Sequence, residues 1–250
     1  EEEAAGVKEG EQAAATVPAA SGEESAGAES SAGATEAPET APVVQEQTFT
    51  LSSRGAVFTF TNFGGGIKGA EMNGQFAVQD KENLVVVNES EAEPIGRLTT
   101  GVDQYLDLVY AHDADRDTDN SITFSGKTRD GLQITKTWTV GKQEGGGAAS
   151  EDDGGSFLLT LDLEFENTGE SSLNLEDYGL FAGSAAPLWK GEWDRHIMLF
   201  YQKDGDYKKR PVTKFKEGKK PHFQEDAGVL GYAGVSNQFF ATIISPENPY

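Results

Sequence analysis

Residues 132–140 have the sequence LQITKTWTV, in which apolar and polar side chains alternate. A period of two, combined with β-branched and aromatic residues, is typical of a strand that buries one face and exposes the other. The same pattern recurs upstream and downstream, in residues 48–51, 56–61, 122–124 and 157–165. Stretches of useful length with the 3.6-residue period of a helix are missing from the sequence. The chain is therefore predicted to be all-β, with antiparallel strands.

Turn-forming residues separate these segments at short intervals. They are Asn62, the pairs 73–74, 125–126, 130–131 and 204–205, and residues 167–169. Asn, Asp, Ser and Gly at such positions favour tight turns, and many short strands joined by turns predict a β-sandwich or barrel. Residues 141–155 (GKQEGGGAASEDDGG) are expected to form a long flexible hairpin loop, and residues 239–246 (FFATIISP) a core strand.

Three consecutive glycines, residues 64–66, resemble part of a phosphate-binding loop. Lys68 is not followed by Ser or Thr, and no helix pattern comes after it, although a P-loop needs both. We expect a structural role instead, because glycine at a strand junction permits a positive φ or a close approach of two backbones.

Charge and composition divide the chain into two parts. The 250 residues carry a formal net charge of −22, and residues 1–46 hold eleven Glu against Lys8 alone. A field of this sign repels phosphate groups, which argues against nucleic-acid binding and against binding of the bulk of the chain to anionic membranes. Residues 1–46 are rich in Ala, Gly, Ser and Pro and lack aromatic residues, so they are predicted to be a disordered linker.

Residues 47–250 are predicted to form one folded domain. The sequence has no cysteine, which excludes disulfides and thiolate metal sites. It has no apolar stretch of 18 residues and begins with Glu1 in place of Met. We therefore expect a membrane anchor or signal to precede Glu1 in the natural protein.

An alternation of carboxylates in residues 113–120 (DADRDTDN) is a candidate calcium site. Calcium takes oxygen ligands from alternate positions of one loop. Thr118 stands where an EF-hand needs Gly, and Phe124 stands where it needs a bidentate Glu. Two readings remain: a plain acidic hairpin loop, or a weak calcium site with the ligands Asp113, Asp115, Asp117 and Asp119.

Residues 189–196 (WKGEWDRH) are a candidate ligand or partner surface through Trp189, Trp193 and His196. Trp rings stack on sugars, and Glu, Asp and His can exchange protons. However, His196 has no second His at ligand spacing, and no Gly-x-Ser-x-Gly elbow is present. We therefore expect no catalytic site and no cofactor.

Residues 207–220 (YKKRPVTKFKEGKK) interrupt the acidic trend of the sequence. A solvated loop is one interpretation of this basic run. The other is a docking patch for an acidic partner or for lipid headgroups, with Lys208, Lys209 and Arg210 as contact residues.

Three segments in this order resemble the large periplasmic domain of YidC-type insertases. They are the strand pair with a Gly-Gly turn in residues 49–67, the strand ending in Asn-x-Gly in residues 161–169, and residues 235–246 (VSNQFFATIISP). Residues 235–246 are similar to a strand of the family in which Asn-Gln is followed by Phe or Tyr and then by Phe-Ala. The acidic lead-in also resembles the linker that follows the family's first transmembrane helix.

The resemblance implies an antiparallel β-supersandwich like that of galactose mutarotases. It implies an accessory domain, periplasmic and attached to a bacterial inner-membrane protein, that helps to insert and fold membrane proteins. Chaperone-like or docking contacts with the Sec translocon and with nascent membrane proteins are implied as well. Family members continue for several strands beyond the Phe-Phe-Ala strand, so we expect the domain to be truncated at Tyr250. The alternative is a carbohydrate-binding or mutarotase-like β-sandwich.

Overall fold

The structure is a computed structural model that describes residues 45–77, 82–88, 93–102, 104–141, 157–215 and 228–248. All of these residues belong to one structural unit, Val44–Tyr250. The predicted linker lies outside the described residues up to residue 44, and so does the predicted hairpin loop from residue 142 onward.

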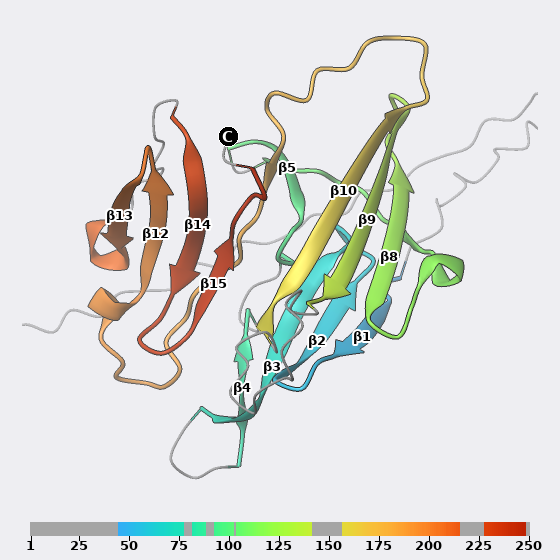
Figure 1. The fold of residues 1–250 in the computed structure, drawn as a ribbon. Helices are drawn as coiled ribbons and strands as arrows, with labels where there is room; N and C mark the ends of the chain where they lie inside the picture. The colour runs from blue at the N-terminus through green and yellow to red at the C-terminus, as the bar shows by residue number, and fades with distance from the viewer. Residues whose placement is uncertain are drawn as a thin grey trace, which may run out of the picture. The chain divides into compact units, whose positions relative to one another are not determined.

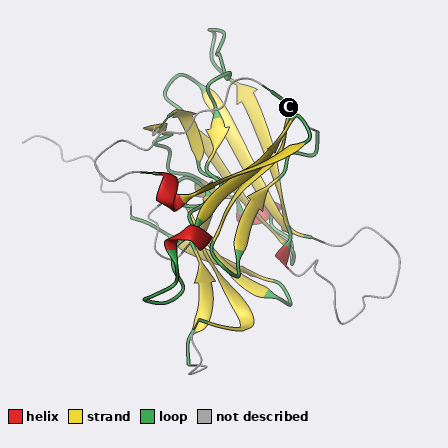
Figure 2. Cartoon of the chain, turned by 90° about the vertical axis from the view of Figure 1, so that its left-hand side faces the viewer, coloured by secondary structure: helices red, strands yellow, loops and turns green. Residues whose placement is uncertain are grey.

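The fold is all-β and antiparallel, as predicted, and consists of four sheets (Figures 1 and 2). The first sheet has the order β1(Thr48–Ser52), β2(Ala56–Thr61), β3(Gly66–Phe76), β4(Leu84–Val87). The second has the order β10(Leu159–Asn167), β9(Leu132–Val140), β8(Ser121–Lys127), β7(Ala111–His112). A small third sheet joins β11(Gly179–Leu180), β5(Leu98–Gly101) and β6(Gln104–Tyr105).

The fourth sheet is formed by the C-terminal part of the chain. Its order is β13(Asp206–Pro211), β12(Met198–Lys203), β14(Leu230–Ser236), β15(Ala241–Ile244). The short 3₁₀ helices η3(Asp194–His196) and η4(Val212–Lys214) flank its first two strands, and η1(Ala114–Arg116) lies between β7 and β8. We call this fourth sheet the C-terminal sheet.

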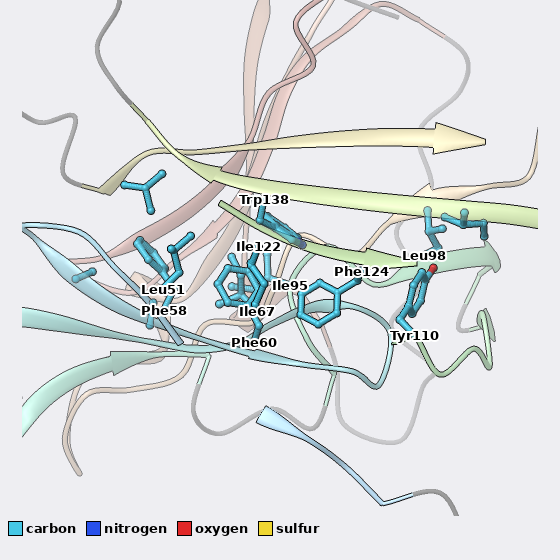
Figure 3. Close-up of a cluster of buried hydrophobic side chains, with 14 of the residues drawn as sticks. Leu51, Phe58, Phe60, Ile67, Ile95, Leu98, Tyr110, Ile122, Phe124 and Trp138 are labelled. Carbon is cyan, nitrogen blue, oxygen red and sulfur yellow. The ribbon is translucent and has the colours of Figure 1, made fainter. Parts of the chain in front are cut away.

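The main core lies between the first and second sheets, which together we call the N-terminal sandwich. The predicted strand over residues 132–140 is β9, and it pairs with β8 on one side and β10 on the other. Its Trp138 ring packs 5.7 Å from Phe60 of β2, and Phe60 lies 6.1 Å from Phe124 of β8 (Figure 3). Large aromatic rings bury much apolar area, so this contact between the sheets is a main source of stability.

Lys136 lies in the middle of this apolar core, with none of its surface exposed. Its Nζ donates to the carbonyl of Gly64 at 2.7 Å and to that of Gly96 at 2.6 Å, and it lies 5.1 Å from the centre of the Tyr110 ring. Burial lowers the pKa of Lys136 to about 7, and the charge of Arg97 acts in the same direction. The lysine thus fastens two loops to β9 with hydrogen bonds that no apolar residue can replace.

The structural role expected for the three glycines is confirmed. Gly64 and Gly65 have φ values of 76° and 59°, in the left-handed region. A Cβ on Gly66 would collide with the carbonyl oxygen of Ile95, and one on Gly65 would press against Tyr110. The close approach lets the Gly65 carbonyl accept a hydrogen bond from Trp138 Nε1 at 3.1 Å.

The predicted turns are confirmed at some positions and wrong at others. Asp204 and Gly205, with φ values of 52° and 85°, join β12 to β13. The pair 125–126 instead lies within β8, and the pair 73–74 lies within β3, where the pairing with β4 is irregular. Strand pairing overrides the local turn preference at 125–126, whereas Gly74 keeps a left-handed φ of 73° within β3.

Two further expectations for the C-terminal sheet are corrected. Residues 239–246 were expected to form a core strand, but β15 is an edge strand, and Phe239 and Ile243 are 61% and 56% exposed. The solvated-loop interpretation of the basic run is wrong for its first residues, because Asp206–Pro211 is the strand β13, paired along its length with β12. Alternation and composition indicate a strand but do not show which side of it is covered.

Candidate functional site

The described residues enclose a pocket of about 570 Å³ next to the C-terminal sheet. One wall is β4 with its flanking residues, a second is the segment 184–188, and a third comes from β14, β15 and the turn between them. This volume falls within the roughly 300–1,000 Å³ typical of ligand pockets. We call it the edge pocket, because β4 and β15 are each the last strand of a sheet.

Asn237 shapes the turn between β14 and β15 and attaches it to the second wall. Its Oδ1 accepts hydrogen bonds from the backbone N–H groups of Phe239 at 3.0 Å and Phe240 at 2.9 Å. Its Nδ2 donates to the carbonyl of Ala186 at 3.2 Å. Asn commonly stabilises turns in this way, and here the same side chain also fixes the spacing of two pocket walls.

Glu192 is a second fastening point, and it is only 6% exposed. Its Oε2 accepts from the N–H of Leu188 at 2.7 Å, and its Oε1 accepts from the N–H of Gln238 at 2.8 Å. A buried carboxylate is retained when backbone donors satisfy both of its oxygens. The segment 188–192 and the turn after β14 are therefore held together.

An exposed aromatic pair lies on these fastened segments. Trp189 and Phe239 are 37% and 61% exposed, and their rings are 5.7 Å apart. Trp189 follows Leu188, and Phe239 follows Gln238, so each ring comes directly after a residue that is bonded to Glu192. Apolar rings held in solvent by buried polar contacts are typical of a contact surface.

The predicted residues Trp193 and His196 follow Trp189 on the same stretch of chain. Their rings are 6.0 Å apart, and Trp193 is 59% exposed. The guanidinium of Arg195 covers one face of the Trp193 ring at 3.8 Å. A sugar stacked on that face would have to displace this cation.

The structure places the three predicted basic residues on one strand but divides them between two faces. Lys208, Lys209 and Arg210 of β13 pair with Tyr201, Phe200 and Leu199 of β12. Successive side chains of a strand point to opposite faces, so Lys209 lies on the face opposite to Lys208 and Arg210. The three residues do not form one continuous basic patch.

The four aspartates proposed as calcium ligands are not brought together. In the described part of the chain, no three His, Cys, Asp or Glu side chains are arranged to hold a metal ion. The carboxylate of Asp117 has partners within the protein. Its Oδ2 lies 2.6 Å from His112 Nε2, and its Oδ1 accepts a hydrogen bond from the N–H of Thr123 at 2.8 Å. These contacts close the hairpin between β7 and β8.

Sequence reasoning missed Glu192, Asn237 and the edge of β4 as parts of the site. Asn237 could have been recognised from the sequence, because Asn is a common turn residue. Glu192 gives no such signal, because only the folded chain brings the N–H of Gln238, 46 residues away, to its carboxylate.

Comparison with protein families identifies the family of the chain. The family model described as the YidC periplasmic domain matches residues 55–249. A search of curated proteins finds no match. The described residues contain no helix with the length and hydrophobicity needed to cross a bilayer. The match covers the N-terminal sandwich from β2 onward, the edge pocket and the C-terminal sheet. The chain therefore belongs to the family of YidC periplasmic domains, the periplasmic accessory parts of inner-membrane insertases.

Proposed function

We propose that this domain is a non-catalytic docking module that holds apolar segments of partner polypeptides, with Trp189 and Phe239 as the central contact residues. The observation that carries this proposal is the exposed aromatic pair fixed in place by the buried carboxylate of Glu192. Preorganised aromatic side chains lose little conformational entropy on binding and often dominate interface energies.

The partners that fit are nascent membrane proteins and components of the Sec translocon. Nascent membrane proteins offer exposed apolar segments, which complement the aromatic pair. The net charge of −22 favours partners, or flanking segments, that carry basic residues. Transient shielding of such segments is a chaperone-like activity. The YidC family match supports this setting.

Site-specific cross-linking in the full-length insertase tests the proposal. A photoreactive phenylalanine analogue at position 239 is expected to cross-link to a membrane-protein substrate during insertion, or to a Sec subunit. The same analogue at Phe157, another exposed aromatic residue, is the matched control and is expected to give at least tenfold less product. Equal labelling from both positions, or none from position 239, contradicts the proposal.

A further inference from the structure

We propose that the edge pocket takes up one extended polypeptide segment of neutral or basic character, which adds as a strand along the outer edge of β4. This inference rests on the proposed docking function and specifies how the partner's backbone is held. Main-chain hydrogen bonds would supply the affinity, and the aromatic pair would select apolar side chains.

The first observation is that the outer edge of β4 is open. β4 pairs with β3 and is the last strand of its sheet. Within the described ranges, no backbone group other than those of β3 pairs with Leu84–Val87. An edge strand presents a row of unpaired N–H and C=O groups, which is a template for another strand.

The second observation is that the pocket runs along this edge. All four residues of β4 line it, together with Asn83 before them and Asn88 after them. Because successive side chains alternate between two faces, a pocket beside one face would be lined by every second residue. Lining by consecutive residues means that the pocket reaches the edge of the strand, and Glu71 of β3, the pairing partner of Val86, shows that it also extends over one face of the sheet. Four strand residues span about 13 Å at ~3.3 Å each.

The third observation is that the opposite wall is fixed at several points. The N–H of Ser184 donates to Asn88 Oδ1 at 3.0 Å, the carbonyl of Ala186 accepts from Asn237, and the N–H of Leu188 donates to Glu192. The space between this wall and β4 is therefore preformed, so a bound segment does not have to order the pocket first.

Charge decides between a foreign segment and a second copy of the chain. Among the described lining residues, the charged ones are Glu71 and Glu82, and none is Lys, Arg or His. A second copy carries a net charge of −22 and would be repelled at low salt. A neutral or basic segment is attracted, which commits the pocket to a partner polypeptide.

A designed heptapeptide, KTVTVTK, is a suitable probe, together with the same peptide N-methylated at alternate residues. Hydrogen exchange of the 250-residue chain is expected to show at least tenfold slower exchange at alternate amides of β4 when the unmodified peptide is added. The N-methylated peptide is expected to bind at least tenfold more weakly, because it lacks the N–H donors. Equal binding of the two peptides, or no protection within β4, overturns the inference.

A pair of variants provides an independent measurement. Leu84→Lys places a like charge against a basic peptide at the pocket wall and is expected to weaken binding at least tenfold. Val102→Lys, at an exposed site outside the pocket, is the matched control and is expected to bind like the parent chain. Loss of affinity in both variants, or in neither, counts against strand addition.

Hydrogen exchange without peptide, measured at several protein concentrations, tests the other occupant. Protection of β4 that grows with protein concentration would mean that a second copy covers the edge, and would overturn the inference. The proposed function is tested separately, by the cross-linking from position 239. Cross-links from position 239 without peptide protection of β4 leave docking in place and remove strand addition, whereas protection without cross-links does the reverse.

Discussion

The N-terminal sandwich and the C-terminal sheet are built from similar strands but are buried very differently. The buried core cluster of the sandwich draws on residues from Leu51 to Val140. In the described part of the C-terminal sheet, only Phe200 and Tyr201 are buried apolar residues. Burial of apolar surface is the main favourable term in folding. The difference shows that stability is concentrated in the N-terminal sandwich, whereas the C-terminal sheet exposes apolar surface to solvent.

Truncating one phenylalanine in each region is the most direct way to break this comparison. Phe60→Ala is expected to lower the free energy of unfolding by about 3–5 kcal/mol, because a buried ring leaves a cavity. Phe239→Ala is expected to change it by less than about 0.5 kcal/mol, because that ring is mostly in solvent. Chemical denaturation measures the free energy of unfolding of both variants. Similar losses in the two would show that stability is not concentrated in the N-terminal sandwich.

The pH dependence of stability sharpens the description of the sandwich. The pKa of Lys136 is about 7 in the folded chain and 10.5 without burial. Between these values the unfolded chain binds a proton that the folded chain has released, so stability rises with pH, by up to about 1.4 kcal/mol per pH unit. Below the folded pKa of about 7, Lys136 is protonated in both states, so it no longer makes stability depend on pH.

Denaturation from pH 7 to about 9.5 measures this slope, since tyrosine titration interferes at higher pH. Lys136→Met is expected to flatten the curve, because the variant has no group to titrate there. A slope that persists unchanged in Lys136→Met would assign the pH dependence to another group. Arg97 and Tyr110 are the charged and titratable neighbours that face Lys136.

Glu192→Gln tests whether the segments that carry Trp189 and Phe239 have their own structural support. The amide has one acceptor oxygen, so one of the two backbone N–H groups now bonded to the carboxylate loses its partner. We expect a loss of about 1–3 kcal/mol, typical of an unsatisfied buried donor, and weaker cross-linking from position 239. Glu166→Gln, at an exposed site of β10, is the control, and an equal loss there would contradict the role of Glu192.

A small effect is also expected at the surface of the sandwich. Lys68 and Glu46 form an exposed ion pair at 2.7 Å, and the hydrogen bond from Lys68 lowers the pKa of Glu46. Its stabilisation is therefore present above the usual pKa of 4.5 and is lost as pH falls. Lys68→Met is expected to cost less than about 1 kcal/mol. A larger loss in thermal melts at low salt would show that stability is not confined to the core.

Much of the sandwich could be predicted from the sequence, because its strands alternate regularly. The expected strand over 132–140 coincides with β9, and the one over 56–61 coincides with β2. The alternation also places Lys136 on the buried face of the strand. The sequence alone does not show which carbonyls accept its hydrogen bonds. Those partners lie 72 and 40 residues away in the chain.

The site was less predictable for physical reasons. Trp189 could be identified by residue type, and it does lie at the surface beside the pocket. The apolar run that forms β15 has the composition of a core strand, and only the order of strands in the sheet makes it an edge. Burial of a strand depends on its neighbours more than on its own residues.

The contacts of Lys136 also set the order in which the molecule can assemble. The carbonyls that β9 binds, those of Gly64, Gly65 and Gly96, all precede it in the chain. During synthesis from the N-terminus, every acceptor has emerged before the donor strand arrives. The sandwich can then close while residues 184–248 are still to come. The order of the chain thus allows the docking surface to be added last, onto a sandwich that can fold before it.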